Sequence, residues 1–360
     1  MRSSDFLMKL WYYFKLGCKT VYDNYFLRGV FVSLAFVFVV IFFKGTFAYD
    51  NKRDDYNFDM GENVIRKLDV YYNDDMDSYN KVTQTDRVLS CLRNRDSIVN
   101  SDGEIGEIIT SIKDLFNKSS NYYSFKYEDI YTGLTLSYNE DGVIFGASSV
   151  KAPLVIYIYE LASEGKIDLD EEMEYTANYY VNGSGIMQGE SVGSKYKIRT
   201  LCDYAIRYSD NIAYTMLINR VGNDNVRDFW TDKGSMVIFS TNDIWGNLSA
   251  RDSNLYMKEL YNFYKRDSVY GEEVMNLFVS SIYKGIHSLD DSYLVADKYG
   301  WTGSIYNDSA VVLADNPYVL SILSNTGYSD FDTFYKEASE LFGRFHKLWW
   351  EMKWEECYPN

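Results

Sequence analysis

The sequence predicts one mixed α/β (α+β) domain over residues 104–345, an antiparallel sheet flanked by helices. An amphipathic helical pattern begins at Ile105, and the strand-like segments YYSFKYEDI and TGLTLSY follow it. Helical patterns fill the middle of the chain. Three further strands, with turns near Ser304 and at residues 315–317, precede a closing helix over residues 330–345. About 240 residues are enough for a substantial core.

An uninterrupted apolar run, GVFVSLAFVFVVIFF, occupies residues 29–43. It is short for a spanning helix and also fits a signal-peptide core, although Lys44 can snorkel and extend the span. Residues 1–44 hold six basic and two acidic residues. The positive-inside rule therefore predicts a cytoplasmic segment at 1–28, a single membrane anchor at 29–48 and an exported remainder. Cleavage near Ala48, which would release a secreted protein, is the alternative.

Residues 49–103 are polar and charged, and they predict an extracytoplasmic spacer in which 88–92 form a short helix. The chain has a net charge of −16, and its acidic excess lies after residue 44. This excess argues against nucleic acid as a partner. The tail at 346–360 is rich in tryptophan, which predicts packing on the sheet or contact with a membrane interface.

Three cysteines follow the apolar run: Cys91, Cys202 and Cys357. Their spacing matches no metal motif, so we expect no structural metal and no cofactor. Cys202 falls on the apolar face of a predicted helix and is expected to be a buried free thiol.

The segment FGASSVKAPLVIYIYE predicts a helix with a serine and a lysine on one face. Apolar residues recur at helical spacing from Val150, and Pro153 suits the first turn. Ser148 then lies at the helix N-terminus, with Lys151 one turn behind it. A serine nucleophile needs a base, and lysine can serve where burial or positive charge lowers its pKa. Taken alone, the pattern also fits a serine that caps its helix.

The sequence Ser209-Asp210-Asn211 lies in a predicted turn between two helices. Leu201 starts the apolar pattern of the first helix, and Gly222 closes the second. Alone, such a turn is common, because these residue types favour turns and caps.

A third segment, Lys298-Tyr299-Gly300, lies near the end of the first of the three later strands. A glycine at this position lets the backbone approach a ligand or another segment closely.

Together, these segments resemble the S-x-x-K, S-D-N and K-T-G set of class A β-lactamases and penicillin-binding proteins. The flanking segments KIDLDEEMEY, GSGIMQGESVGSKYKIRTL, YNDSAVV and PYVLSIL are similar to the same family, over roughly residues 104–345. The resemblance implies a β-lactamase/transpeptidase-like fold. It also implies an all-helical subdomain between the first two motifs.

The resemblance implies four catalytic residues. Ser148 attacks a carbonyl, Lys151 is its general base, Ser209 relays a proton to the leaving nitrogen, and Lys298 keeps Lys151 neutral and attracts a carboxylate. The backbone N–H groups of Ser148 and Trp301 form the oxyanion hole. Asn211 orients Lys151 or binds the substrate amide. Substrate binding is expected at Asn211, Tyr299, Gly300, Trp301 and Thr302.

Two departures from the family pattern stand out. Tyr299 replaces the threonine or serine whose hydroxyl holds the substrate carboxylate, and Thr302 can substitute for it only if the strand register differs. The E-x-x-L-N segment of class A β-lactamases, whose glutamate positions the deacylating water, is also missing. Asp243 is the nearest acid, and we interpret it as a solvated turn residue.

We therefore expect an extracytoplasmic serine acyl-transfer hydrolase that acts on an amide of a peptidoglycan peptide or a β-lactam. It would act through a Ser148 acyl-enzyme that deacylates slowly. An efficient β-lactamase and a catalytically impaired, wall-facing binding module are the alternatives. His287 and His346 lie near no motif, which argues against a Ser-His-Asp triad.

Overall fold

The computed structural model describes residues 103–117, 122–237, 244–325 and 331–357. Four predicted features lie outside these ranges: the cytoplasmic segment, the span at 29–48, the spacer up to residue 102, and Asp243. Within them, no helix is both long enough and apolar enough to cross a bilayer.

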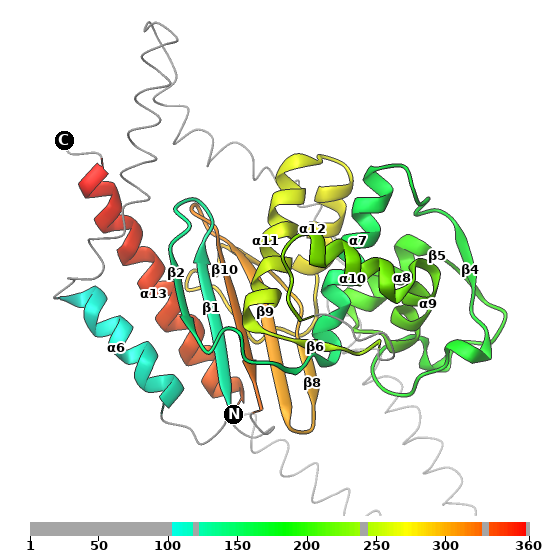
Figure 1. The fold of residues 1–360 in the computed structure, drawn as a ribbon, viewed down its shortest axis with the longest axis horizontal. Coiled ribbons are helices and arrows are strands. Elements are labelled where there is room, and N and C mark those ends of the chain that lie inside the picture. The colour runs from blue at the N-terminus through cyan, green and yellow to red at the C-terminus, as the bar shows by residue number, and fades with distance from the viewer. Residues whose placement is uncertain (1–102, 118–121, 238–243, 326–330, 358–360) are drawn as a thin grey trace, which may run out of the picture. The chain divides into compact units, whose positions relative to one another are not determined.

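A fully antiparallel sheet forms the centre of the domain, as the sequence predicts. Its order is β2-β1-β10-β9-β7, and β8 also pairs with β9 (Figure 1). The strands are β1 (Tyr123–Asp129), β2 (Thr135–Tyr138), β7 (Leu294–Asp297), β8 (Gly300–Thr302), β9 (Ile305–Leu313) and β10 (Tyr318–Ser324). A separate two-stranded pair joins β3 (Ile144–Phe145) to β6 (Asn247–Leu248).

The strand that carries the third motif is interrupted, where the sequence predicts a single strand. Asp297 pairs with Ala310 and Gly300 pairs with Asn307, which is one continuous register along β9. Strands β7 and β8 are therefore two parts of one edge strand, and Lys298 and Tyr299 form the break between them.

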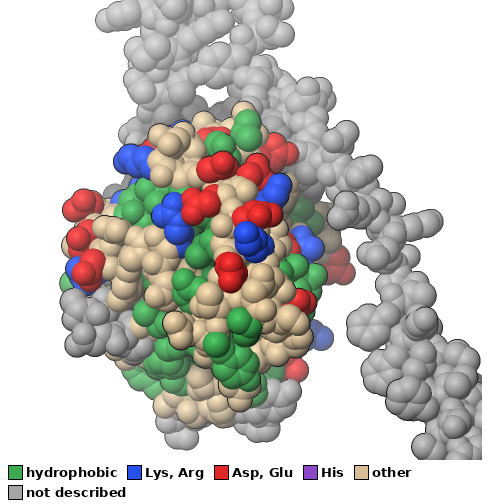
Figure 2. All heavy atoms as spheres, turned by 90° about the vertical axis from the view of Figure 1, so that its right-hand side faces the viewer, with side chains coloured by type: hydrophobic (Ala, Val, Ile, Leu, Met, Phe, Trp, Pro, Cys, Tyr) green, Lys and Arg blue, Asp and Glu red, His purple; other side chains and the backbone are tan. Residues whose placement is uncertain are grey.

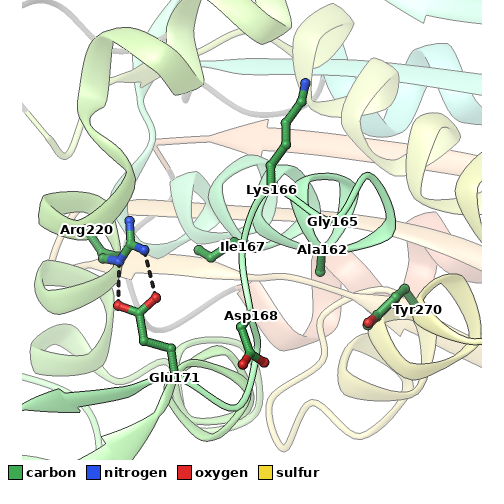
Figure 3. A pocket seen from close by; sticks show the side chains of 8 residues that line it. All are labelled: Ala162, Gly165, Lys166, Ile167, Asp168, Glu171, Arg220 and Tyr270. Atoms are coloured by element: carbon green, nitrogen blue, oxygen red, sulfur yellow. Dashed lines mark hydrogen bonds and ion pairs between the residues drawn. The ribbon is translucent and has the colours of Figure 1, made fainter.

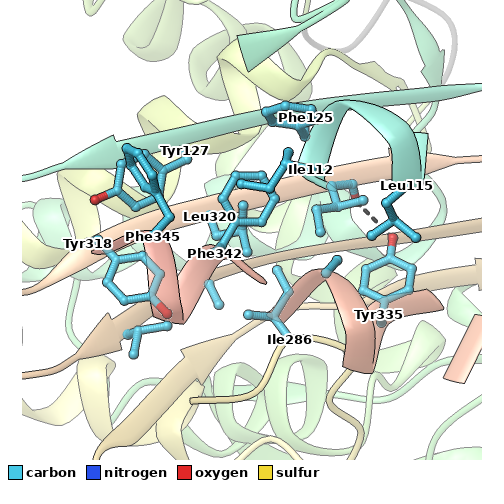
Figure 4. Close-up of a cluster of buried hydrophobic side chains, with 14 of the residues drawn as sticks. Ile112, Leu115, Phe125, Tyr127, Ile286, Tyr318, Leu320, Tyr335, Phe342 and Phe345 are labelled. Carbon is cyan, nitrogen blue, oxygen red and sulfur yellow. Dashed lines mark hydrogen bonds between the residues drawn. The ribbon is translucent and has the colours of Figure 1, made fainter. Parts of the chain in front are cut away.

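Helices cover both faces of the sheet (Figure 1). Helix α6 (Glu104–Asn117) packs with α13 (Phe331–Cys357) on one face, and α11 (Ala250–Arg266) contacts β1, β9 and β10. Figure 4 shows the core beneath α6 and α13, where aromatic rings of strands and helices meet. Phe125 and Tyr127 share this face because strand side chains alternate, and Phe125 lies 4.4 Å from Phe116 between ring centroids.

The segment between the first two motifs is only partly helical, which corrects the prediction of an all-helical subdomain. Its helices are α7 (Lys151–Ser163), α8 (Ile198–Arg207), and the short 3₁₀ turns at Ala177–Tyr179 and Met187–Gly189. It also contains a hairpin of β4 (Glu172–Glu174) and β5 (Lys195–Lys197), in which glutamates oppose lysines across the strands. Such opposite-charge pairs favour strand pairing, and an apolar-pattern reading overlooks them.

Further helices, α9 (Asn211–Val221), α10 (Asn223–Asp232) and α12 (Tyr270–Val279), complete this side of the domain. Gly222 ends α9 with φ of 85°, as its sequence position predicts. Cys202 is a buried free thiol, so that prediction is confirmed.

The closing helix is longer than predicted. Helix α13 continues past Phe345 to Cys357, so the expected boundary at residue 345 falls inside one helix. The reason is that apolar residues keep their helical spacing into the tail, and Trp349 is fully buried in the sheet-facing core. The first part of the tail is thus part of the fold.

We predict that Trp349→Ala lowers the free energy of unfolding by about 3–5 kcal/mol, because it leaves a large cavity in the core. Trp354→Ala, on the same helix but 43% exposed, should change it by less than about 1 kcal/mol. Urea unfolding followed by circular dichroism measures both. Equal losses in the two variants would contradict the assignment of residues 346–354 to the packed helix.

Candidate active site

Ser148 lies in a 3₁₀ turn, Ala147–Val150, that leads directly into α7. Its position at a helix start is as predicted. The preceding Ala147 has φ of 47°, a left-handed conformation that is costly for a residue with a side chain. Such strain persists only where the surroundings impose it. Here Ser149 N–H donates to Gly146 O at 3.1 Å, and the side-chain amide of Asn307 donates to Phe145 O at 3.0 Å.

Lys151 is the centre of the site and is completely buried. Its Nζ lies 3.0 Å from Ser148 Oγ and 3.2 Å from Ser209 Oγ. It also lies 2.5 Å from the backbone oxygen of Ser209 and 2.8 Å from Asn211 Oδ1. The last two oxygens only accept hydrogen bonds, so a neutral amine can donate to both and keep its lone pair for the Ser148 hydroxyl.

Burial and the nearby ammonium of Lys298 lower the pKa of Lys151 well below its ordinary value, against the opposing charge of Asp210. None of the ion pairs in the described ranges involves Lys151. The structure thus places a buried lysine with a lowered pKa beside a serine hydroxyl, which is the arrangement that a general base needs.

The Ser-Asp-Asn turn presents three different groups to three different partners. Ser209 has φ of 53°, and its hydroxyl stands between Lys151 and Lys298. Asp210 caps α9 by accepting from the N–H groups of Ile212 and Ala213. Asn211 turns its oxygen to Lys151, so it has the first of its two predicted orientations.

Lys298 is also fully buried, and its Nζ lies 3.1 Å from Ser209 Oγ and 2.8 Å from the backbone oxygen of Tyr299. Burial lowers its pKa to about 8, although Asp297 and Asp308 oppose this shift. Below that pH it is a cation on the far side of Ser209 from Lys151. The two lysines therefore bracket one serine hydroxyl.

Two buried acids lie behind Lys298. Asp297 pairs with Lys284 at 2.7 Å, and Asp308 accepts from the N–H groups of Gly285 and Ile286 at 2.7 and 2.9 Å. Burial, with the neighbouring Asp308, raises the pKa of Asp297 well above its ordinary value. These contacts fix the loop before β7 and so fix the strand that carries Lys298.

Gly300 allows the edge strand to approach the nucleophile turn. A Cβ at this position would lie 2.5 Å from Ser149 N and 2.7 Å from Gly146 O. The N–H of Lys298 donates to Ser309 O on β9, and amide directions alternate along a strand. The N–H of Trp301 therefore faces away from β9, on the edge against which the Ser148 turn packs.

Tyr299 stands beside Lys298, with the Lys298 Nζ 4.3 Å from its ring centroid. Its ring contacts Tyr283 at 5.0 Å between centroids. Burial raises the pKa of Tyr299 to about 12, and a hydrogen-bond interaction with the Ser209 side chain opposes that shift. Thr302 pairs with Ile305 next to the hairpin turn in the same unbroken register, so it does not take the place of Tyr299.

Three residues outside the motifs also contact the site: Asn307, Ser184 and Trp245. Asn307 is fully buried beside Asp308 and Ser309, and this run of polar residues within a predicted strand is the sequence signal for a structural role. Ser184 donates to the backbone oxygen of Ser209 at 2.7 Å. The ring of Trp245 lies 5.6 Å from Lys151 Nζ, on the short segment where class A β-lactamases carry their glutamate.

Apolar side chains are exposed close to the motifs. Figure 2 shows charged side chains concentrated on the upper part of one face of the molecule and hydrophobic ones on the lower part. Tyr283, which contacts Tyr299, is 50% exposed, and Trp301, which follows Gly300, is 45% exposed. A substrate that reaches Ser148 therefore meets apolar side chains near the buried lysines.

A pocket of about 360 Å³ lies elsewhere, at the C-terminal ends of α7 and α9 (Figure 3). Helix α7 separates it from Lys151 by about 16 Å, at 1.5 Å per residue. Its main charged pair, Glu171 with Arg220, is already closed by bonds of 2.9 and 2.7 Å. It contains no motif residue.

The sequence of residues 107–351 matches the model of the beta-lactamase enzyme family, which is more than half of the chain. The chain belongs to this family. It is accordingly a serine hydrolase, and the predicted family assignment is confirmed. No curated protein sequence matches the chain.

Solved structures share the fold at low sequence identity. A single-substitution mutant of PBP-A, solved as an acyl-enzyme complex with penicillin G, has a TM-score of 0.63 and 17% identity over 68% of this chain and 97% of that one. A β-lactamase from Sphaerobacter thermophilus has a TM-score of 0.59 and 16% identity, over 67% of this chain and 96% of that one. An ancestral class A β-lactamase has a TM-score of 0.57 and 21% identity, over 67% of this chain and 99% of that one. These similarities confirm the β-lactamase/transpeptidase-like fold.

Proposed function

We propose that this enzyme acylates Ser148 with the carbonyl group of a β-lactam or of a peptidoglycan peptide amide. The observation that carries the proposal is the buried Lys151 amine, 3.0 Å from Ser148 Oγ and held by two oxygens that only accept. This arrangement supplies a base for the serine without a histidine.

The proposed step conserves atoms and charge. Lys151 takes the hydroxyl proton of Ser148 while Ser148 Oγ bonds to the substrate carbonyl carbon. The carbon–nitrogen bond then breaks, and the leaving nitrogen receives a proton from the Ser209 hydroxyl. Ser209 recovers a proton from Lys151, whose Nζ lies 3.2 Å away. The backbone N–H groups of Ser148 and Trp301 stabilise the oxyanion.

Lys298 supplies positive charge on the other side of Ser209 and attracts the substrate carboxylate. Tyr299 adds an aromatic ring at this point, in place of a small hydroxyl side chain. The carboxylate then relies on charge more than on a short side-chain hydrogen bond. This supports a substrate range that differs from that of the K-T-G enzymes.

Slow deacylation is the second part of the proposal. A water must be activated to hydrolyse the ester, and no glutamate lies between Ser209 and Ala250. The described end of this segment turns the Trp245 ring, not a carboxylate, toward Lys151. The acyl-enzyme is therefore long-lived, as in a penicillin-binding protein, rather than rapidly turned over as in an efficient β-lactamase.

Export of the domain is the third part. Cys357 is disulfide-bonded, and disulfides form and persist in oxidising compartments. Together with the charge asymmetry around residues 29–43, this supports a membrane-anchored protein with its catalytic domain outside the cytoplasm.

A fluorescent penicillin should label the protein covalently, and Ser148→Ala should abolish labelling. Lys151→Ala should slow it by about 10²–10⁴-fold through loss of general-base help. Intact-mass spectrometry measures the adduct. Ser163→Ala, at the other end of α7, is the matched control and should label normally. A native protein without adduct after long exposure would instead support the binding-module alternative.

The adduct should also persist. Because positioned base catalysis is missing from the second step, hydrolysis should be roughly 10²–10⁴-fold slower than with a positioned base. Nitrocefin should give a stoichiometric burst followed by little turnover. Sustained turnover above about one per second that Ser148→Ala removes would identify an efficient β-lactamase.

Protease added to intact protoplasts should digest the domain and leave the short N-terminal segment. Non-reducing peptide mapping on the same sample should show Cys357 in a disulfide and Cys202 as a thiol. A protease-protected domain with reduced Cys357 would place the domain in the cytoplasm and would remove the wall substrate.

A further inference from the structure

Residues 182–187, here called the clamp segment, pass directly over the Ser-Asp-Asn turn. Gly183 and Gly185 have φ of 130° and 119°. A Cβ at Gly183 would lie 2.5 Å from Asn211 Nδ2, and one at Gly185 would lie 2.1 Å from a carboxylate oxygen of Asp210. Two glycines therefore allow a contact that other residues would block.

The clamp segment is joined to the turn by hydrogen bonds from both sides. Asn211 N–H donates to Ser184 O at 3.0 Å, and Met187 N–H donates to Asp210 Oδ2 at 2.7 Å. The Asn211 side chain donates to Asn182 O at 3.2 Å. The Ser-Asp-Asn turn is thus held by the clamp segment as well as by its own helix, α9.

The Ser184 hydroxyl contacts the same two oxygens that hold Lys151. It lies 2.7 Å from the backbone oxygen of Ser209 and 3.4 Å from Asn211 Oδ1. Each of these oxygens also accepts from Lys151. A carbonyl oxygen that already accepts from a hydroxyl is a weaker acceptor for a neighbouring ammonium, and the hydroxyl proton repels that charge.

We propose that Ser184 is a positioning residue for acylation: through the Ser209 carbonyl it helps keep the Lys151 amine neutral and directed at Ser148. This inference rests on the acylation function proposed above. Ser184 touches neither Ser148 nor the reacting atoms, and it acts only through the groups that hold Lys151.

Other groups also act on the charge of Lys151. Lys298 faces it from the edge strand, and Asp210 faces it from the start of α9. The rings of Tyr214 and Trp245 lie 5.9 and 5.6 Å from its Nζ. None of these groups changes in a Ser184 variant, so a shift in such a variant reports on the hydroxyl.

The test uses the full-length chain and measures two quantities. Acylation by a fluorescent penicillin is measured from pH 4 to 10, and the Lys151 ¹³Cε signal is titrated by NMR after assignment by its loss in Lys151→Ala. In Ser184→Ala, both the acid limb of the rate profile and the Lys151 titration should move up by roughly 0.5–1 pH unit, the size of one neutral hydrogen bond.

Two variants complete the design. Ser184→Thr keeps the hydroxyl at this exposed position and should restore both curves. Ser191→Ala, an exposed serine further along the same connection, should match the unmodified protein.

The outcomes separate the two proposals. If Ser184→Ala lowers the rate equally at every pH and leaves the Lys151 titration unchanged, Ser184 is merely structural and the inference is overturned. If the unmodified protein forms no adduct, the proposed function fails, but the NMR titration still decides whether Ser184 controls the protonation of Lys151.

Discussion

The buried amine of Lys151 is the constraint on which the rest of the site depends. A lysine with no exposed surface is tolerated only if its charge is absent or fully compensated. The structure uses both means: Lys298 and burial disfavour the charge, while the Ser209 and Asn211 oxygens satisfy the remaining N–H groups. The left-handed backbone of Ala147 and Ser209 sets the two hydroxyls around that amine.

The sheet and its helices supply the rigidity that this arrangement needs. The motif lysine Lys298 lies at a break in an edge strand, yet the register on either side is unchanged, because β9 and β10 are held in the core. Asn307 reaches from β9 to the nucleophile turn, and Gly300 lets β8 approach it. The nucleophile turn, β8 and β9, which are far apart in sequence, are therefore held in fixed positions relative to one another.

Much of the fold and of the candidate site could be predicted from the sequence. The motif residues, the strands of the antiparallel sheet and the helix that begins near Ile105 all carry local patterns. The remainder depends on tertiary contacts. No local pattern shows that Tyr299 packs on Tyr283 beside Lys298, or that Ser184 shares oxygens with Lys151. The helical spacing of apolar residues continues beyond Phe345, but only the packing of Trp349 in the core shows that the closing helix extends to Cys357. The β4–β5 hairpin depends on cross-strand charge rather than apolar alternation.

The two buried lysines also make the folded protein a weaker base than its unfolded chain. Lys298 has a pKa of about 8 when folded, against 10.5 for an unperturbed lysine. Between pH 8 and 10.5 the unfolded chain binds a proton at Lys298 that the folded protein does not, so the free energy of unfolding rises with pH across this interval. Below pH 8 both states bind the proton, and the cost of burying the charged lysine is fully present. At neutral pH the buried Lys298 therefore lowers the free energy of unfolding, and packing of the surrounding core must offset this loss.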